Sequence, residues 1–194
     1  MVAGQLNKIL IYILLIVFLN QNLYGIEFKG NFEQGSFILG KTNPGSEVSI
    51  DNRKVKVSKD GFFAFGLSKE RKNNVIIKVL KDKKLEIFEK KVLKREYKIQ
   101  RIDGLPEKKV TPPKEVYERI KRENKIIGVA RSIESDLTFF KDRFTKPLDE
   151  AIITGVYGSQ RILNGKPKWP HYGVDFAASE GTEIKAMLNG TATM

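Results

Sequence analysis

Pro170-His-Tyr-Gly-Val-Asp-Phe-Ala177 is the stretch that decides how the C-terminal part of this chain folds. It contains the only histidine of the protein, His171, four residues before Asp175. A neutral imidazole and a carboxylate are both common zinc ligands, and a catalytic zinc site combines three protein ligands with one open position. The stretch therefore supplies two candidate ligands.

The spacing of this pair predicts a bend in the chain. Four residues of strand rise about 13 Å, which is more than two ligands of one small cation can span. A helix is disfavoured because Pro170 precedes the pair, Gly173 lies inside it and a strand-like segment, 174–177, follows. We expect Gly173 to be the pivot, since glycine accepts backbone angles that other residues avoid. The alternative is that His171 makes only a loop hydrogen bond to Asp175.

Further sequence blocks surround the pair: Tyr157-Gly-Ser-Gln-Arg161, Gly181-Thr-Glu-Ile-Lys-Ala186 and Asn189-Gly190. Together with 170–178, these blocks resemble, in order and spacing, the start of the catalytic domain of lysostaphin-type zinc endopeptidases. The resemblance implies that His171 and Asp175 are two ligands of a Zn²⁺ cofactor. It also implies that the substrate is the peptide cross-link of peptidoglycan.

The family completes its site with a later His-x-His motif, whose second histidine is the third zinc ligand and whose first assists catalysis. This chain contains no second histidine, so the resemblance places the catalytic residues C-terminal to Met194. The end of the chain points the same way, because a strand at 182–187, a turn at Asn189-Gly190 and a short return at 191–194 predict an interrupted hairpin. We therefore expect the 194 residues alone to bind zinc weakly or not at all, to be inactive and to fold poorly beyond Pro147.

Two residues near the pair are candidates for substrate binding. Arg161 can hold a carboxylate through two parallel hydrogen bonds, and the alternative is a surface arginine without a partner. Tyr172, like Trp169, flanks the candidate ligands and offers an aromatic ring to a substrate. The alternative for both rings is that they fill the β-core.

Residues 1–25 have the features of a secretory signal peptide, with Lys8 before an apolar run at 9–19. Leu23 is larger than the residue usual at a cleavage site, so an uncleaved membrane anchor is the alternative. In both cases we expect the rest of the chain to be exported to the periplasm or cell envelope. The chain has no cysteine, so its domains must be stable without disulfides.

The formal net charge of +12 suits an exported protein that contacts an anionic envelope polymer, such as peptidoglycan, or acidic lipid head groups at the membrane surface. Lysines dispersed over a solvated surface are the alternative interpretation. Nucleic acid is not an expected partner, because the protein is expected outside the cytoplasm.

The rest of the chain predicts a mainly β fold with a connecting helix. Alternating apolar and polar residues indicate a β-sandwich at 26–100, with turns at Asp51-Asn52 and 81–84 and with 92–100 as an outer strand. This module is either a binding or spacing module or only a packed scaffold. Residues 101–146 are predicted to be a linker and an amphipathic helix, and 147–194 to be the first part of an antiparallel β peptidase domain.

The helix is expected to begin at the N-cap Thr111 and to reach about Ser135. Because acidic residues interrupt its basic face, we expect it to pack against the protein's own domains rather than on a membrane. We expect Phe139, Phe140 and Phe144 to dock the following segment onto the C-terminal β-domain.

The chain remains open to two other functions. It is a non-catalytic cell-wall-binding or regulatory protein if its peptidase domain is degenerate. It is a periplasmic scaffold if the sandwich and helix perform the binding. A His-x-His motif further along the reading frame distinguishes the enzyme from both.

Overall fold

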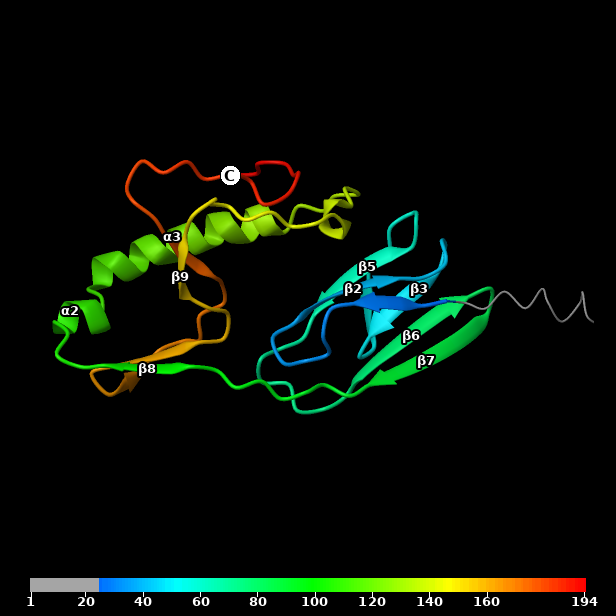
Figure 1. The fold of residues 1–194 in the computed structure, drawn as a ribbon, viewed down its shortest axis with the longest axis horizontal. Helices are drawn as coiled ribbons and strands as arrows, with labels where there is room; N and C mark the ends of the chain where they lie inside the picture. Colours follow the sequence, from blue (N-terminus) through cyan, green and yellow to red (C-terminus); the bar gives the residue numbers. More distant parts are fainter. Residues whose placement is uncertain (1–24) are drawn as a thin grey trace, which may run out of the picture.

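The structure is a computed structural model that describes residues 25–194. It is mainly β with one long connecting helix, which confirms the predicted fold class (Figure 1). The predicted signal or anchor segment, 1–25, lies outside the described residues except for Gly25. In the part of the chain that is described, no helix is both long enough and apolar enough to cross a membrane.

The N-terminal region is a sandwich of two antiparallel sheets. The first sheet has the order β1-β2-β5 and consists of β1 (Glu27–Lys29), β2 (Phe37–Lys41) and β5 (Phe62–Gly66). The second has the order β4-β3-β6-β7 and consists of β4 (Arg53–Val55), β3 (Glu47–Ile50), β6 (Val75–Lys81) and β7 (Lys84–Lys90). Inward-facing side chains of both sheets form one core, made of Ile38, Val48, Ile50, Phe63, Leu67, Val75, Ile77 and Val79.

Short turns set the register of the second sheet. Asp51 and Asn52 have φ angles of 47° and 67°, so both adopt the left-handed conformation of a two-residue hairpin turn. Asp82 and Lys83, with φ angles of 49° and 63°, form the same kind of turn between β6 and β7. Both predicted turns are confirmed. Turns of this kind suit a hairpin because their twist matches the twist of the strands they join.

The core depends on a glycine opposite its largest side chain. Phe63 is completely buried, and its Cα is paired with that of Gly40 across β5 and β2. A Cβ atom on Gly40 would lie 2.1 Å from the ring of Phe63. The ring therefore occupies the space above Gly40, in a pairing that also stabilises a glycine within a strand.

The outer strand predicted at 92–100 does not form. Leu93 makes one isolated bridge to Glu33, and only β8 (Ile99–Ile102) is a strand. β8 pairs in parallel with β10 (Gln160–Leu163) of the C-terminal half instead of joining the sandwich. The prediction was wrong because side-chain alternation indicates an extended chain but does not specify which sheet edge it joins.

The connecting region contains a short helix, α2 (Glu107–Val110), before the long helix, α3 (Lys114–Arg131). The predicted cap at Thr111 is wrong, because Pro113 occupies the N-cap position of α3. The hydroxyl of Thr111 instead lies 2.9 Å from Glu107 Oε1, at the end of α2.

The expected packing of α3 against the protein's own domains is also wrong. No residue of α3 is buried, and Ile126 and Val129 are 55% and 64% exposed. The predicted docking of the phenylalanines is wrong for Phe144, whose ring meets Phe37 of β2 edge-on at 6.4 Å. The segment after α3 therefore contacts the preceding sandwich.

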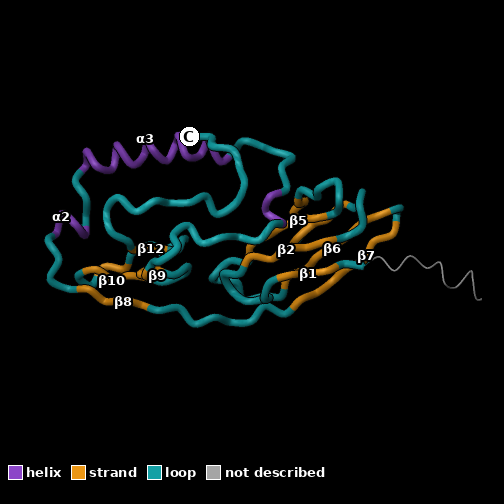
Figure 2. The backbone as a smooth tube through the Cα atoms, turned by 45° about the horizontal axis from the view of Figure 1, so that its top comes forward, coloured by secondary structure: helices purple, strands orange, loops and turns teal. Residues whose placement is uncertain are grey.

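The C-terminal half contains two small sheets (Figure 2). One has the order β11-β10-β8, where β11 is Lys166–Pro167, and the other pairs β9 (Ile152–Gly155) with β12 (Asp175–Ala177). The strand predicted at 182–187 and the hairpin after it do not form. Instead, Lys185 N–H donates to Pro147 O at 2.8 Å, because a segment without a neighbouring strand satisfies its backbone groups elsewhere.

Replacing Gly40 by alanine tests the packing of the core. Gly40→Ala should lower the free energy of unfolding by about 1–3 kcal/mol, because the new methyl group overlaps the Phe63 ring. Gly66→Ala in β5 is the matched control, since nothing lies within 4 Å of its Cβ position. Urea unfolding of both variants measures the difference. Equal stability of the two variants would contradict the Gly40–Phe63 contact.

Candidate metal centre

The pairing of β9 with β12 positions Asp175. Asp175 is the Cα partner of Gly155, and the register shifts between Asp175 and Phe176. The irregularity lies at the first residue of β12, where the chain arrives from His171. A Cβ atom on Gly155 would lie 2.5 Å from Asp175 Oδ2. The missing side chain of Gly155 thus provides the space for the carboxylate.

The main chain of His171 is fixed by the loop that follows β9. Gly158 N–H donates to His171 O at 2.7 Å, and His171 N–H donates to Ser159 O at 2.8 Å. Ser159 is itself tied to the same loop, since its hydroxyl donates to Val156 O at 2.8 Å. These hydrogen bonds satisfy both backbone groups of His171 and hold its Cα at a defined place.

The two predicted ligands meet at their side-chain ends. His171 Nε2 lies 3.1 Å from Asp175 Oδ1. The distance would permit an ion pair, but Nε2 is shielded from solvent and has no hydrogen-bond partner. The ring does not direct an N–H at the carboxylate, so this close approach is not a hydrogen bond.

This geometry fits two ligands of one zinc ion. With metal–ligand distances of about 2.0–2.2 Å, two tetrahedral ligands lie about 3.4 Å apart. The observed separation of 3.1 Å is close to that value. An imidazole nitrogen without a hydrogen bond, beside a carboxylate oxygen, can hold a cation with its lone pair. The residues present therefore fit a zinc ion as two of the three expected protein ligands.

The third ligand is not found among residues 25–194. In this range, no group of three His, Cys, Asp or Glu side chains gathers closely enough to bind a metal. His171 is also the only histidine of the 194-residue sequence. Among the described residues, His171 and Asp175 are thus the two members of the expected ligand set that come together.

The other two predicted site residues, Tyr172 and Arg161, have different surroundings. Tyr172 is 59% exposed, and its ring lies 5.8 Å from that of Tyr157. Arg161 lies on β10, where its Nε donates to Gln100 Oε1 at 3.3 Å. This contact directs Arg161 to β8, and no recorded contact joins it to the His171–Asp175 pair.

The chain bends at Gly173, between His171 and Asp175, as predicted. Gly173 is not among the glycines with positive φ, so the bend does not use a backbone angle that only glycine accepts readily. Gly155 and Gly158 are the important glycines around the pair, and sequence reasoning missed their role. An isolated glycine in a strand signals a close approach of another group, which is the signal that Gly155 offers.

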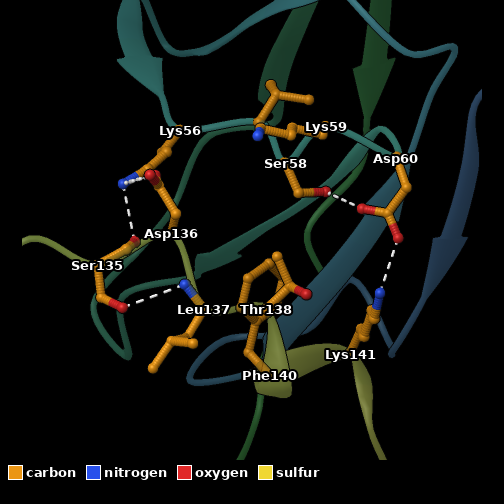
Figure 3. Close-up of a pocket in the computed structure, with 11 residues that line it drawn as sticks. Lys56, Ser58, Lys59, Asp60, Ser135, Asp136, Leu137, Thr138, Phe140 and Lys141 are labelled. Carbon is orange, nitrogen blue, oxygen red and sulfur yellow. Dashed lines mark hydrogen bonds and ion pairs between the residues drawn. The ribbon is translucent and has the colours of Figure 1, made fainter.

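A separate cavity of about 430 Å³ lies at a seam between the sandwich and the segment after α3 (Figure 3). Its lining comes from 56–60 and 135–141. Ion pairs cross the seam from Lys56 to Asp136 at 2.9 Å and from Lys141 to Asp60 at 2.7 Å. Since these opposite charges satisfy each other, we interpret the cavity as part of a structural contact and assign it no chemistry.

Acid should weaken the Lys141–Asp60 contact. Hydrogen bonds from Lys141 and Ser58 lower the pKa of Asp60 from 3.8 to about 2. The contact therefore contributes fully above pH 3.8, and its contribution is lost as the pH falls through about 2. Hydrogen-exchange protection of 135–141, corrected for intrinsic rates, should fall over this range.

Lys141→Ala should reduce the hydrogen-exchange protection of 135–141 at neutral pH. It should also remove the loss of protection in acid that protonation of Asp60 causes. Lys54→Ala, which breaks an ion pair with Glu47 within the sandwich, is the matched control. An unchanged acid response in Lys141→Ala would show that this ion pair does not hold the segment.

Gly155→Ala should displace the Asp175 carboxylate. The carboxylate is the end of a mobile side chain, so we expect it to move while the fold persists. The Hε1 resonance of His171 is the only histidine signal of the protein, and nuclear magnetic resonance should show it shifted. Gly190→Ala is the control, because its Cβ position has no neighbour within 4 Å. A shift in neither variant would contradict the described contact.

Comparison with known proteins adds no family assignment. No protein-family model matches the chain, and no curated protein matches it. The resemblance to lysostaphin-type endopeptidases therefore rests on the motifs between residues 157 and 190, and the functional argument rests on the geometry of His171 and Asp175.

Proposed function

We propose that this protein is an exported zinc metalloendopeptidase that acts on the cross-link peptides of peptidoglycan. The observation that carries the proposal is the unpaired, buried Nε2 of His171, 3.1 Å from Asp175 Oδ1. A buried nitrogen without a partner destabilises the fold by about 1–3 kcal/mol unless something binds it. A cation shared with Asp175 removes that cost.

His171 and Asp175 bind the metal in this proposal, and the chain orients both through backbone contacts. A bound zinc supplies Lewis-acid polarisation of a scissile carbonyl. Tyr172 lies beside His171 and is exposed, so its ring is available to a peptide. Arg161 remains a proposed partner for a substrate carboxylate, although its guanidinium has to leave Gln100 to bind one.

In this proposal the third ligand comes from outside the described residues. The family resemblance indicates the second histidine of a later His-x-His motif, whose first histidine assists catalysis. The charge of +12 supports the proposed substrate, because a basic protein is attracted to an anionic wall polymer or membrane surface. Export is proposed from the character of residues 1–25.

The second candidate function is a non-catalytic wall-binding or regulatory protein with a degenerate peptidase domain. It is favoured by the absence of a third ligand near His171 within the described residues. The two functions differ in one respect that can be measured, which is whether the complete protein holds zinc at His171.

Zinc analysis of the purified product of the complete reading frame tests the proposal. We expect about one zinc per chain, and at least tenfold weaker zinc binding in His171→Ala, because one ligand is lost. Peptidoglycan digestion should be lost in the same variant. Lys185→Ala, which removes an exposed ion pair with Asp149, is the matched control. Equal zinc content and equal digestion in the original protein and His171→Ala would remove His171 from the mechanism. Absence of both zinc and digestion in the original protein would exclude the enzyme and leave the non-catalytic function.

A further inference from the structure

Tyr97 connects the sandwich to the loop that holds His171. Its hydroxyl donates to Gln34 O at 2.8 Å, in the turn that precedes β2. Gln34 also binds the Tyr97 segment directly, since its N–H donates to Leu93 O at 2.9 Å and its Oε1 accepts from Arg95 N–H at 3.2 Å. Tyr97 is therefore anchored to the sandwich through its side chain and its neighbours.

Two glycines fit closely around the Tyr97 ring. A Cβ atom on Gly158 would lie 2.1 Å from ring atom Cε1, and one on Gly35 would lie 2.6 Å from the phenol oxygen. Both glycines have positive φ angles, of 84° and 77°. Gly35 belongs to the sandwich and Gly158 to the loop after β9, so the ring fills the space between them.

Backbone hydrogen bonds connect Gly158 to His171, the candidate zinc ligand. Gly158 N–H donates to His171 O, and His171 N–H donates to Ser159 O. Gln160 N–H donates to Lys98 O at 3.1 Å, next to Tyr97 in the chain. A shift of Gly158 relative to the sandwich would thus move the main chain of His171.

We infer that Tyr97 is a positioning residue for His171, which makes the sandwich a necessary support of the metal centre. This inference rests on the proposed function. Tyr97 touches neither ligand side chain, and it acts through the backbone of Gly158 and His171. The sandwich is then more than a separate binding or spacing module, because the position of a zinc ligand depends on it.

The surroundings of Tyr97 suit this role. Burial raises the pKa of its phenol, so the hydroxyl stays protonated and can donate to Gln34 at neutral pH. Lys69 Nζ lies 4.8 Å from the ring centre, and the Arg95 guanidinium lies 5.5 Å from it. Both cations lie within cation–π range of the ring, and Gly158 packs against its Cδ1 and Cε1 atoms.

Substitutions of Tyr97 in the full chain test the inference through the His171 resonance. Zn²⁺ is titrated while the Hε1 signal of this single histidine is followed, which works even for weak binding. Tyr97→Ala should weaken the apparent Zn²⁺ affinity about tenfold, as loss of supporting contacts around metal ligands does. Tyr97→Phe keeps the ring and loses one hydrogen bond, so its affinity should fall about threefold. Tyr117→Ala, at a half-exposed tyrosine of α3, is the matched control.

The outcomes separate this inference from the proposed function. Graded losses in Tyr97→Phe and Tyr97→Ala, with Tyr117→Ala like the original protein, support positioning. An unchanged Zn²⁺ affinity in both Tyr97 variants would overturn it.

If the His171 signal of the 194-residue chain does not respond to Zn²⁺, His171 and Asp175 alone do not hold the ion, and zinc analysis of the complete protein decides the proposed function. The metal-free spectrum then shows whether Tyr97 positions His171. A shifted Hε1 signal in Tyr97→Ala but not in Tyr117→Ala supports the contact, and an unshifted signal removes it.

Discussion

The pairing of β9 with β12 is the constraint on which the C-terminal half depends. It places Asp175 opposite Gly155, where the absence of a side chain leaves room for the carboxylate. The preceding loop, held by its own backbone hydrogen bonds, then brings His171 Nε2 to 3.1 Å from Asp175 Oδ1. A nitrogen buried without a hydrogen bond is unfavourable in a finished fold. That local cost is the physical reason to look for a bound cation.

The stability of this protein is unevenly distributed. Among residues 25–194, the buried hydrophobic side chains lie in the sandwich, apart from Val110 and Leu148. In the C-terminal half, Ile152 of β9 is 73% exposed, and Trp169 beside the ligand loop is 89% exposed. Hydrophobic burial scales with the apolar area removed from water, so the sandwich contributes most of the folding free energy. The His171–Asp175 pair lies in the less stable half.

Two separate segments attach that half to the sandwich (Figure 1). One runs through 93–102, where Tyr97 fits between two glycines and β8 joins β10. The other is the seam of exposed ion pairs at 134–141. Packed rings and backbone hydrogen bonds are directional and little affected by salt, whereas exposed ion pairs contribute little and are screened. The first attachment is therefore the one able to hold a ligand in place.

The sequence by itself determined the mainly β class, the turns at Asp51-Asn52 and 81–84, and the close approach of the His171 and Asp175 side chains. These features are local, because turn residues, alternation and short ligand spacing act over a few neighbours. Tertiary structure decided that β8 joins β10, that Gly155 makes room for the Asp175 carboxylate, and that Tyr97 reaches Gly158. Such contacts join residues far apart in the chain, and their selection depends on which surfaces remain available once the sandwich has formed.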